Sequence, residues 1–175
     1  SAISRMLEAD PAIKVVSKVA NGRQAIDEVK RVNPDVVVLD IEMPIMDGIT
    51  ALPLLLRADP KIRVVMASTL TTRGADIALR ALRLGAADYV PKPSSIGTVS
   101  DDAFQRELVA KVKGLARQRS RPAPMPTAHS GRSAPTLPPR LLAVGSSTGG
   151  PQALFAFFQG LGRQVPVPIV VTQHM

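Results

Sequence analysis

Short apolar runs alternate with amphipathic stretches along the first two thirds of the chain. Apolar runs bounded by polar residues predict strands that are buried on both faces of a parallel sheet. These runs cover Ile13–Val16, Val36–Leu39, Val64–Ala67 and Tyr89–Val90. Stretches with helical periodicity follow them, at residues 23–30, 48–58, 74–84 and 101–117. This alternation predicts an α/β fold, a doubly wound parallel sheet with helices on both faces.

The C-terminal part of the chain repeats the alternation once. Apolar runs at Leu141–Val144 and Pro168–Gln173 predict two strands. Between them, Pro151–Phe158 reads as a helix with proline in its first turn. A strand–helix–strand unit of this length makes two parallel strands whose carboxyl ends point the same way. We therefore expect the first βαβ unit of a second α/β, Rossmann-like domain.

The segment between these two parts has a composition that cannot form a core. It is rich in Pro, Ser, Ala and Arg, with prolines at Pro122, Pro124, Pro126, Pro135, Pro138 and Pro139. Such segments favour extended, solvated backbone and act as linkers. We therefore predict one domain over residues 1–119, an interdomain linker over 120–139 and the beginning of a second domain over 140–175.

A serine and a histidine in the second part suggest hydrolytic chemistry. Gly145–Gly149 fits the G-x-S-x-G pattern, in which a serine stands on a sharp turn from strand to helix. His174 follows the next predicted strand, and adjacent strands lie about 4.8 Å apart, so Ser147 and His174 would meet at one edge. A serine beside an imidazole base is two thirds of a hydrolase triad. In the alternative reading the turn binds an anion or nothing, and the histidine is structural.

Polar side chains also end three consecutive strands of the first part. Asp40, Ser68 and Lys92 supply a carboxylate, a hydroxyl and an ammonium group to the carboxyl edge of the sheet, where open α/β sheets bind ligands. The set suits a carboxylate that is phosphorylated, with the other two groups holding the phosphoryl oxygens. Taken singly, each residue could equally be a helix cap or a surface group.

Composition narrows the possible functions. The net charge of +8 comes from 22 basic and 14 acidic residues, but much of the excess lies in and beside the linker. Aromatic residues make up 3%, too few for a base-stacking surface, so we expect no nucleic-acid partner. The chain has no cysteine, which excludes disulfides and thiolate chemistry. No apolar run approaches the roughly 18 residues of a membrane span, so we expect a cytoplasmic protein without membrane insertion.

Residues 1–119 resemble the receiver domain of two-component response regulators, which has a flavodoxin-like fold. The motifs that carry the resemblance are Leu39–Pro44, Met46–Gly48, Met66–Ser68 and Gly85–Pro93. The resemblance implies that Asp40 accepts a phosphoryl group, that Ser68 and Tyr89 are switch residues and that Lys92 binds the phosphate. It also implies Mg²⁺ held by the Asp40 carboxylate and the Glu42 main-chain carbonyl. Receivers carry an acidic pair at the end of their first strand, and we expect this chain to begin after that strand and pair.

The receiver, the proline-rich linker and the segments Val144–Pro151 and Thr172–Met175 together resemble the chemotaxis protein-glutamate methylesterase (CheB) family. The resemblance implies that Ser147 is the nucleophile and His174 the base, with the catalytic Asp beyond Met175, so that this chain alone is inactive. Thr148 and Gly149 belong to the oxyanion turn.

The implied reaction is hydrolysis of glutamate methyl esters, and deamidation of glutamines, on methyl-accepting chemoreceptors. A chemotaxis histidine kinase is the implied phosphodonor, and the esterase needs no cofactor.

Two other functions are compatible with a receiver and a linker. One is a DNA-binding output domain, but a strand–turn–helix follows the linker rather than a helix-turn-helix. The other is a signalling or binding module without catalysis, in which the turn at Gly145–Gly150 binds an anion or a partner. The second alternative stays open on the sequence alone.

Overall fold

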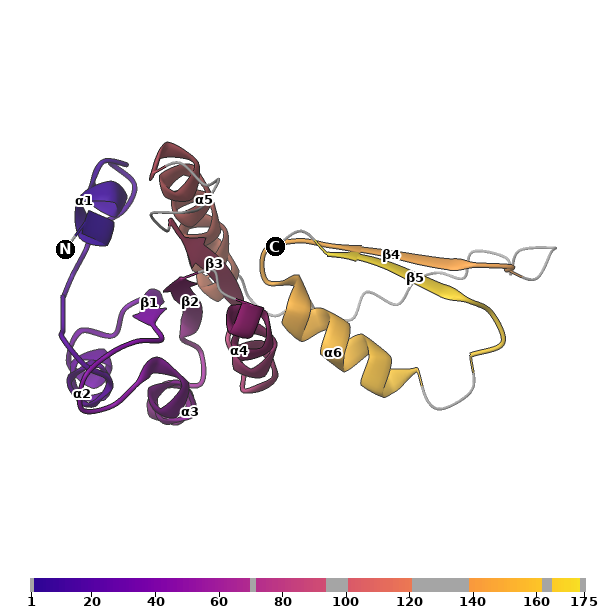
Figure 1. Ribbon diagram of the computed structural model, residues 1–175, viewed down its shortest axis with the longest axis horizontal. Helices are drawn as coiled ribbons and strands as arrows, with labels where there is room; N and C mark the ends of the chain where they lie inside the picture. The colour runs from indigo at the N-terminus through magenta and orange to yellow at the C-terminus, as the bar shows by residue number, and fades with distance from the viewer. Residues whose placement is uncertain (1, 70–71, 94–100, 121–138, 162–164, 174–175) are drawn as a thin grey trace.

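A parallel three-stranded sheet forms the first part of the molecule. The computed structural model describes residues 2–69, 72–93, 101–120, 139–161 and 165–173. The strands are β1 (Val36–Asp40), β2 (Arg63–Thr69) and β3 (Asp88–Lys92), in the order β1-β2-β3. The helices are α1 (Ala2–Glu8), α2 (Gly22–Val32), α3 (Gly48–Ala58), α4 (Thr72–Arg83) and α5 (Asp101–Ser120) (Figure 1).

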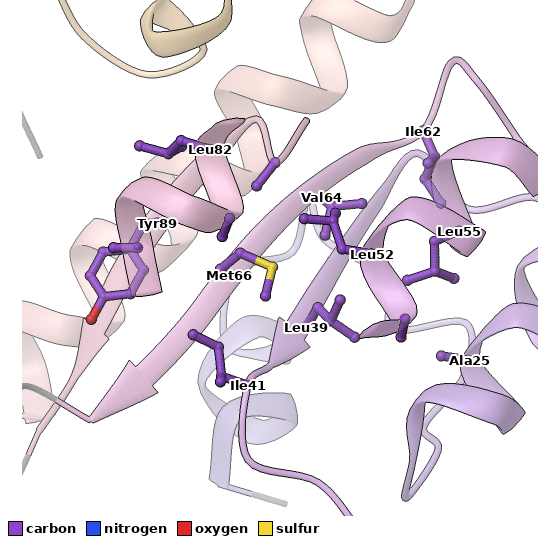
Figure 2. Close-up of a cluster of buried hydrophobic side chains, with 14 of the residues drawn as sticks. Ala25, Leu39, Ile41, Leu52, Leu55, Ile62, Val64, Met66, Leu82 and Tyr89 are labelled. Carbon is purple, nitrogen blue, oxygen red and sulfur yellow. The ribbon is translucent and has the colours of Figure 1, made fainter. Parts of the chain in front are cut away.

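Helices cover both faces of this sheet, because successive side chains of a strand point to opposite faces. On β2, Val64 and Met66 pack into a core with α2, α3 and α4, which Figure 2 shows. Val65 and Ala67 pack on the other face, against α1 and α5. All four side chains are fully buried. The prediction of a doubly wound, flavodoxin-like parallel sheet is thus confirmed.

The strand expected at Ile13–Val16 is not observed. This segment makes no ladder, although its side chains alternate between half-buried and exposed positions as in a strand. A groove of about 760 Å³ lies between residues 12–20 and β1. A strand is defined by a hydrogen-bonded neighbour, and across this groove β1 is too far away to serve as one.

Asparagine and aspartate side chains cap the N-termini of α2 and α3. Asn21 accepts a hydrogen bond from the Gln24 N–H at 3.0 Å, and Asp47 accepts one from the Thr50 N–H at 2.7 Å. These are N-cap contacts, which satisfy backbone donors that the helix itself leaves unpaired. The bond from Thr50 lowers the pKa of the Asp47 carboxyl. The start of α3 is therefore fixed directly after the loop that follows Asp40.

A buried ion pair joins α5 to the sheet. Lys111 Nζ lies 2.8 Å from Asp88 Oδ1, and both side chains are almost fully buried. Asp88 Oδ1 also accepts the Tyr89 N–H, and Glu107 lies 3.4 Å from the same ammonium group. An unpaired charge at this depth would be strongly unfavourable, so the pair fixes the position of α5 against β3.

The C-terminal part forms the βαβ unit expected from the sequence. β4 (Leu142–Ser146) and β5 (Ile169–Gln173) pair in parallel, and α6 (Gly150–Gly160) connects them. Neither of the two hydrophobic cores includes a residue of this unit, and large apolar side chains of α6 and β5 are exposed in the described chain. A two-stranded unit of this kind buries too little apolar surface to be stable alone.

Contacts with the first part of the chain hold this unit in place. α6 lies beside α4 (Figure 1). The Gln152 side-chain amide donates to the carbonyls of Leu82 and Ala86, at 2.7 and 2.9 Å. Leu82 lies in the last turn of α4, and Ala86 lies in the loop that leads to β3. α6 is thus attached to the first part of the chain through main-chain acceptors.

We predict that Lys111→Met destabilises the chain by about 3–5 kcal/mol, because it leaves the Asp88 carboxylate buried without its counter-charge. Urea unfolding followed by circular dichroism measures the change. Lys30→Met, at an exposed position of α2, is the matched control and should change the free energy of unfolding by less than about 0.5 kcal/mol. Equal effects of the two substitutions would contradict the prediction.

Candidate phosphoacceptor site and nucleophile turn

Asp40 and Lys92 meet at the carboxyl edge of the sheet, as the strand ends predicted. Asp40 ends β1 and Lys92 ends β3, and their side chains form an ion pair across the end of β2. Asp40 Oδ1 also accepts the Glu42 N–H at 3.2 Å. The side chains of Asp40 and Lys92 are 32% and 22% exposed. The carboxylate is therefore accessible to a donor molecule and lies beside a cation that can neutralise added negative charge.

Ser68 and Tyr89 lie on the strands next to this pair. Ser68 follows Ala67, the register partner of Asp40, and is buried. The Tyr89 hydroxyl donates to the Ser68 main-chain carbonyl at 3.5 Å. Burial raises the pKa of the Tyr89 phenol. Tyr89 is thus a neutral, buried contact between β3 and the strand end that carries Ser68.

The loop after Asp40 folds back on the strand because Gly48 has no side chain. A Cβ at Gly48 would lie 2.1 Å from the Asp40 carbonyl oxygen. The Gly48 N–H donates to the Ile41 carbonyl at 3.0 Å. This close approach of two backbone segments fixes the direction in which the chain leaves Asp40 and so holds the acceptor at the sheet edge.

The described residues do not by themselves make a Mg²⁺ site. Asp40 and the Glu42 main-chain carbonyl can supply oxygen ligands, but the Asp40 carboxylate is already paired with Lys92. Within the described part of the chain, no group of three or more His, Cys, Asp or Glu side chains lies close enough to hold a metal ion. Mg²⁺ requires octahedral oxygen coordination, which these two groups cannot provide alone.

Ser147 stands in the turn between β4 and α6. Its side chain is exposed, and its carbonyl accepts the Gly150 N–H at 2.7 Å. Gly149 has φ = +77°, a left-handed conformation that favours glycine. A Cβ at Gly150 would lie 1.7 Å from Ser146 Oγ, so this position also requires glycine. The sharp turn expected from the G-x-S-x-G pattern is present.

The structure separates the two adjacent serines chemically. Ser146 Oγ is buried against Gly150 and has no hydrogen-bond partner among the described residues. Ser147, one position later, faces solvent. Of these two serines, only Ser147 is therefore accessible to an external molecule.

The end of β5 lies directly beside this turn. Ser146 and Gln173 are register partners, and the Gln173 side-chain amide donates to the Ser147 carbonyl at 3.3 Å. His174 follows Gln173 and lies outside the described residues, so its role as the base stays a prediction. The two strand ends do meet at one edge, as the sequence predicted.

The turn that carries Ser147 also contacts the first part of the chain. The Gln118 side chain on α5 donates to the Thr148 carbonyl at 3.3 Å. The sequence pattern indicates no role for this glutamine, nor for Gln152 and Gln173. A glutamine in a helix or strand carries no distinctive pattern, so only the tertiary structure reveals that each amide reaches a main-chain carbonyl.

Comparison with known proteins identifies the first part. Residues 1–103 match the family model of the response regulator receiver domain. The chain belongs to the receiver family. The receiver domain of CheB from Thermotoga maritima superposes with a TM-score of 0.54 at 36% identity, covering 67% of this chain and 84% of that one. The receiver domain of NarL from Mycobacterium tuberculosis gives 0.54 at 28% identity, covering 66% and 84%.

Residues 142–175, after the receiver, match the CheB methylesterase family. The chain is 50% identical to a protein-glutamate methylesterase/protein-glutamine glutaminase of Rhodospirillum centenum, over 99% of this chain and 52% of that protein. It is 46% identical to the corresponding protein of Azospirillum brasilense, over 99% and 50%. The chain thus spans about half the length of these curated relatives. Both resemblances inferred from the sequence are confirmed.

No helix in the described ranges is both long and apolar enough to cross a membrane.

We predict that Tyr89 ionises at a higher pH in the folded chain than in the unfolded one, where a tyrosine titrates near ~10. Because the folded pKa is raised, this group favours folding below the unfolded value, and the contribution is lost as the pH rises through the folded value. The chain has one tyrosine and no tryptophan, so tyrosinate absorbance reports this residue alone. Titrations in buffer and in urea with coincident midpoints would show that the phenol is not buried.

Proposed function

We propose that the complete protein is a phosphorylation-regulated protein-glutamate methylesterase and glutaminase. The observation that carries the proposal is the exposed Ser147, set in a glycine turn beside the end of the strand that leads to His174. This turn lies in a chain that has a receiver domain and whose residues 142–175 match the CheB methylesterase family. We assign the receiver to residues 1–119, the linker to 120–139 and the start of the catalytic domain to 140–175.

The proposed reaction is nucleophilic acyl transfer to water. His174 takes the Ser147 proton as Ser147 Oγ attacks the ester carbonyl of a methylated glutamate side chain. The tetrahedral intermediate collapses, methanol leaves with the proton from the imidazolium, and a glutamyl-serine ester remains. Water, deprotonated by the same histidine, hydrolyses this ester. With a glutamine substrate the leaving group is ammonia, and the other steps are the same.

Two further groups complete the proposed catalytic machinery. Main-chain N–H groups of Thr148 and Gly149, in the turn after Ser147, are suited to stabilise the oxyanion. We propose a catalytic Asp in the complete protein, as the family resemblance implies, which would orient the His174 ring. A triad without its acid loses about 10⁴ in rate, so the 175-residue chain alone should lack useful activity.

Regulation would pass from Asp40 to the nucleophile turn. A histidine kinase transfers its phosphoryl group to an Asp40 oxygen, and Lys92 exchanges its ion pair with the carboxylate for one with the phosphoryl oxygens. Receiver domains generally bind Mg²⁺ for this reaction. The contacts of Gln118 and Gln152 support coupling between the receiver and the turn at Ser147. They attach the turn and α6 to α5 and α4 of the receiver. A receiver held beside the turn would hinder the approach of a bulky receptor segment to the exposed Ser147, and its rearrangement on phosphorylation would remove that hindrance.

The proposed partners follow from the same assignment. The substrate is the methylated glutamate of a methyl-accepting chemoreceptor, and the phosphodonor is a chemotaxis histidine kinase. We further propose a cytoplasmic location for the protein.

We predict that a fluorophosphonate probe labels the full-length protein at Ser147. Ser147→Ala should abolish the labelling, because no hydroxyl remains at the exposed position of the turn. Ser146→Ala is a closely matched control one residue away, and it should keep the labelling since its hydroxyl is buried. In-gel fluorescence measures both variants. Labelling lost in Ser146→Ala and kept in Ser147→Ala would reverse the assignment, and an unlabelled phosphorylated wild type would favour a non-catalytic module.

We also predict that Asp40→Asn abolishes phosphorylation of the full-length protein and the rise in esterase rate that follows it. The amide lacks the anionic oxygen that attacks phosphohistidine. Transfer of labelled phosphate and methanol release measure the two effects. Asp76→Asn, at an exposed position of α4, should behave as wild type. Undiminished labelling of Asp40→Asn would show that another residue is the acceptor.

A further inference from the structure

The peptide group between Ser147 and Thr148 is held from both sides of the turn. Its carbonyl oxygen accepts the Gly150 N–H at 2.7 Å and the Gln173 side-chain amide at 3.3 Å. The first bond closes the turn locally, while the second comes from the neighbouring strand. The orientation of this one peptide plane is therefore tied to β5 as well as to the turn.

A fixed carbonyl also fixes the opposite side of the same peptide. The described chain contains no cis peptide bond, and in a trans peptide the C=O and the N–H point in opposite directions. Holding the Ser147 carbonyl toward Gln173 therefore directs the Thr148 N–H away from it. Within the described part of the chain, no group accepts that N–H. It remains available as a donor to a ligand.

The space around Gly150 is consistent with a placed amide. A Cβ at Gly150 would lie 3.2 Å from Gln173 Oε1 and 1.7 Å from Ser146 Oγ. The absence of a side chain at Gly150 thus lets the Gln173 amide pack across the turn and reach the Ser147 carbonyl. Gln173 is half-buried, and its main chain is held by pairing with Ser146, so its side chain begins from a fixed point.

We propose that Gln173 is a positioning residue for the esterase, which aims the Thr148 N–H at the oxyanion by anchoring the Ser147 carbonyl. The inference rests on the proposed function. An oxyanion donor is effective only when it is already oriented toward the position where charge develops. A peptide plane held by the turn alone can rotate, and rotation moves the N–H away from that position. Gln173 limits this rotation without contacting the substrate.

This role differs from a purely structural one in what it changes. A structural glutamine stabilises the fold, so its loss lowers the number of competent active sites but leaves each remaining site unchanged. A positioning glutamine stabilises the transition state more than the bound ester, so its loss lowers kcat for each site and leaves KM unchanged. Titration of the active sites before the rate measurement separates the two cases.

The test uses the full-length enzyme, phosphorylated by its donor, with Gln173→Met and Gln173→Glu. Methionine keeps the approximate volume, and glutamate keeps the shape but has no N–H donor at neutral pH. We expect kcat for each titrated site to fall about 10- to 100-fold in both variants, less than the loss for a deleted oxyanion donor because the Gly150 N–H bond remains. KM for the methyl ester should stay within twofold of wild type.

Gln159→Met is the matched control, since this glutamine is exposed near the C-terminal end of α6, at the opposite end of the helix from the turn. It should keep the wild-type kcat. A wild-type kcat for each titrated site in both Gln173 variants would overturn the inference while leaving the esterase intact. A wild-type enzyme that releases no methanol would overturn the proposed function and this inference together. If Gln173→Met fails to fold, the isosteric Gln173→Glu decides the result.

Discussion

Strand β2 is the constraint on which the receiver part depends. It pairs with β1 on one side and β3 on the other, and its alternate residues fill two separate cores. Because all three strands are parallel, their carboxyl ends must reach the same edge. Asp40 and Lys92 come from strands that are not neighbours. Their ion pair therefore depends on β2, which lies between β1 and β3 and sets the register of both.

The same geometric rule operates in the C-terminal unit, but with different support. β4 and β5 are parallel, and their ends bring Ser146 and Gln173 into register. Two cores of buried side chains support the receiver sheet, whereas the β4–α6–β5 unit contributes to neither core. Its turn is defined instead by close approach: Gly149 adopts a left-handed conformation, and Gly150 leaves room for Ser146 and Gln173.

Three glutamine amides connect these parts. Gln118 and Gln152 join the turn and α6 to the receiver, and Gln173 joins the turn to β5. Each donates to a main-chain carbonyl, a contact that needs no charge and depends strongly on distance and angle. Such contacts add little net stability, about 1 kcal/mol each, but they fix geometry and break after small displacements. This combination is compatible with the proposed regulation, in which the contacts hold before phosphorylation and break after it.

The sequence determined the order of strands and helices, because apolar periodicity follows directly from burial. It also placed Asp40, Ser68 and Lys92 at strand ends, and Ser147 in a glycine turn, since these positions follow from where the apolar runs stop. The strand expected at Ile13–Val16 failed because periodicity reports burial and cannot supply a pairing partner. Only the tertiary structure decided which carbonyls the glutamine amides reach and that the Ser146 hydroxyl is buried against Gly150. Those outcomes depend on packing between segments distant in the chain, which no local pattern records.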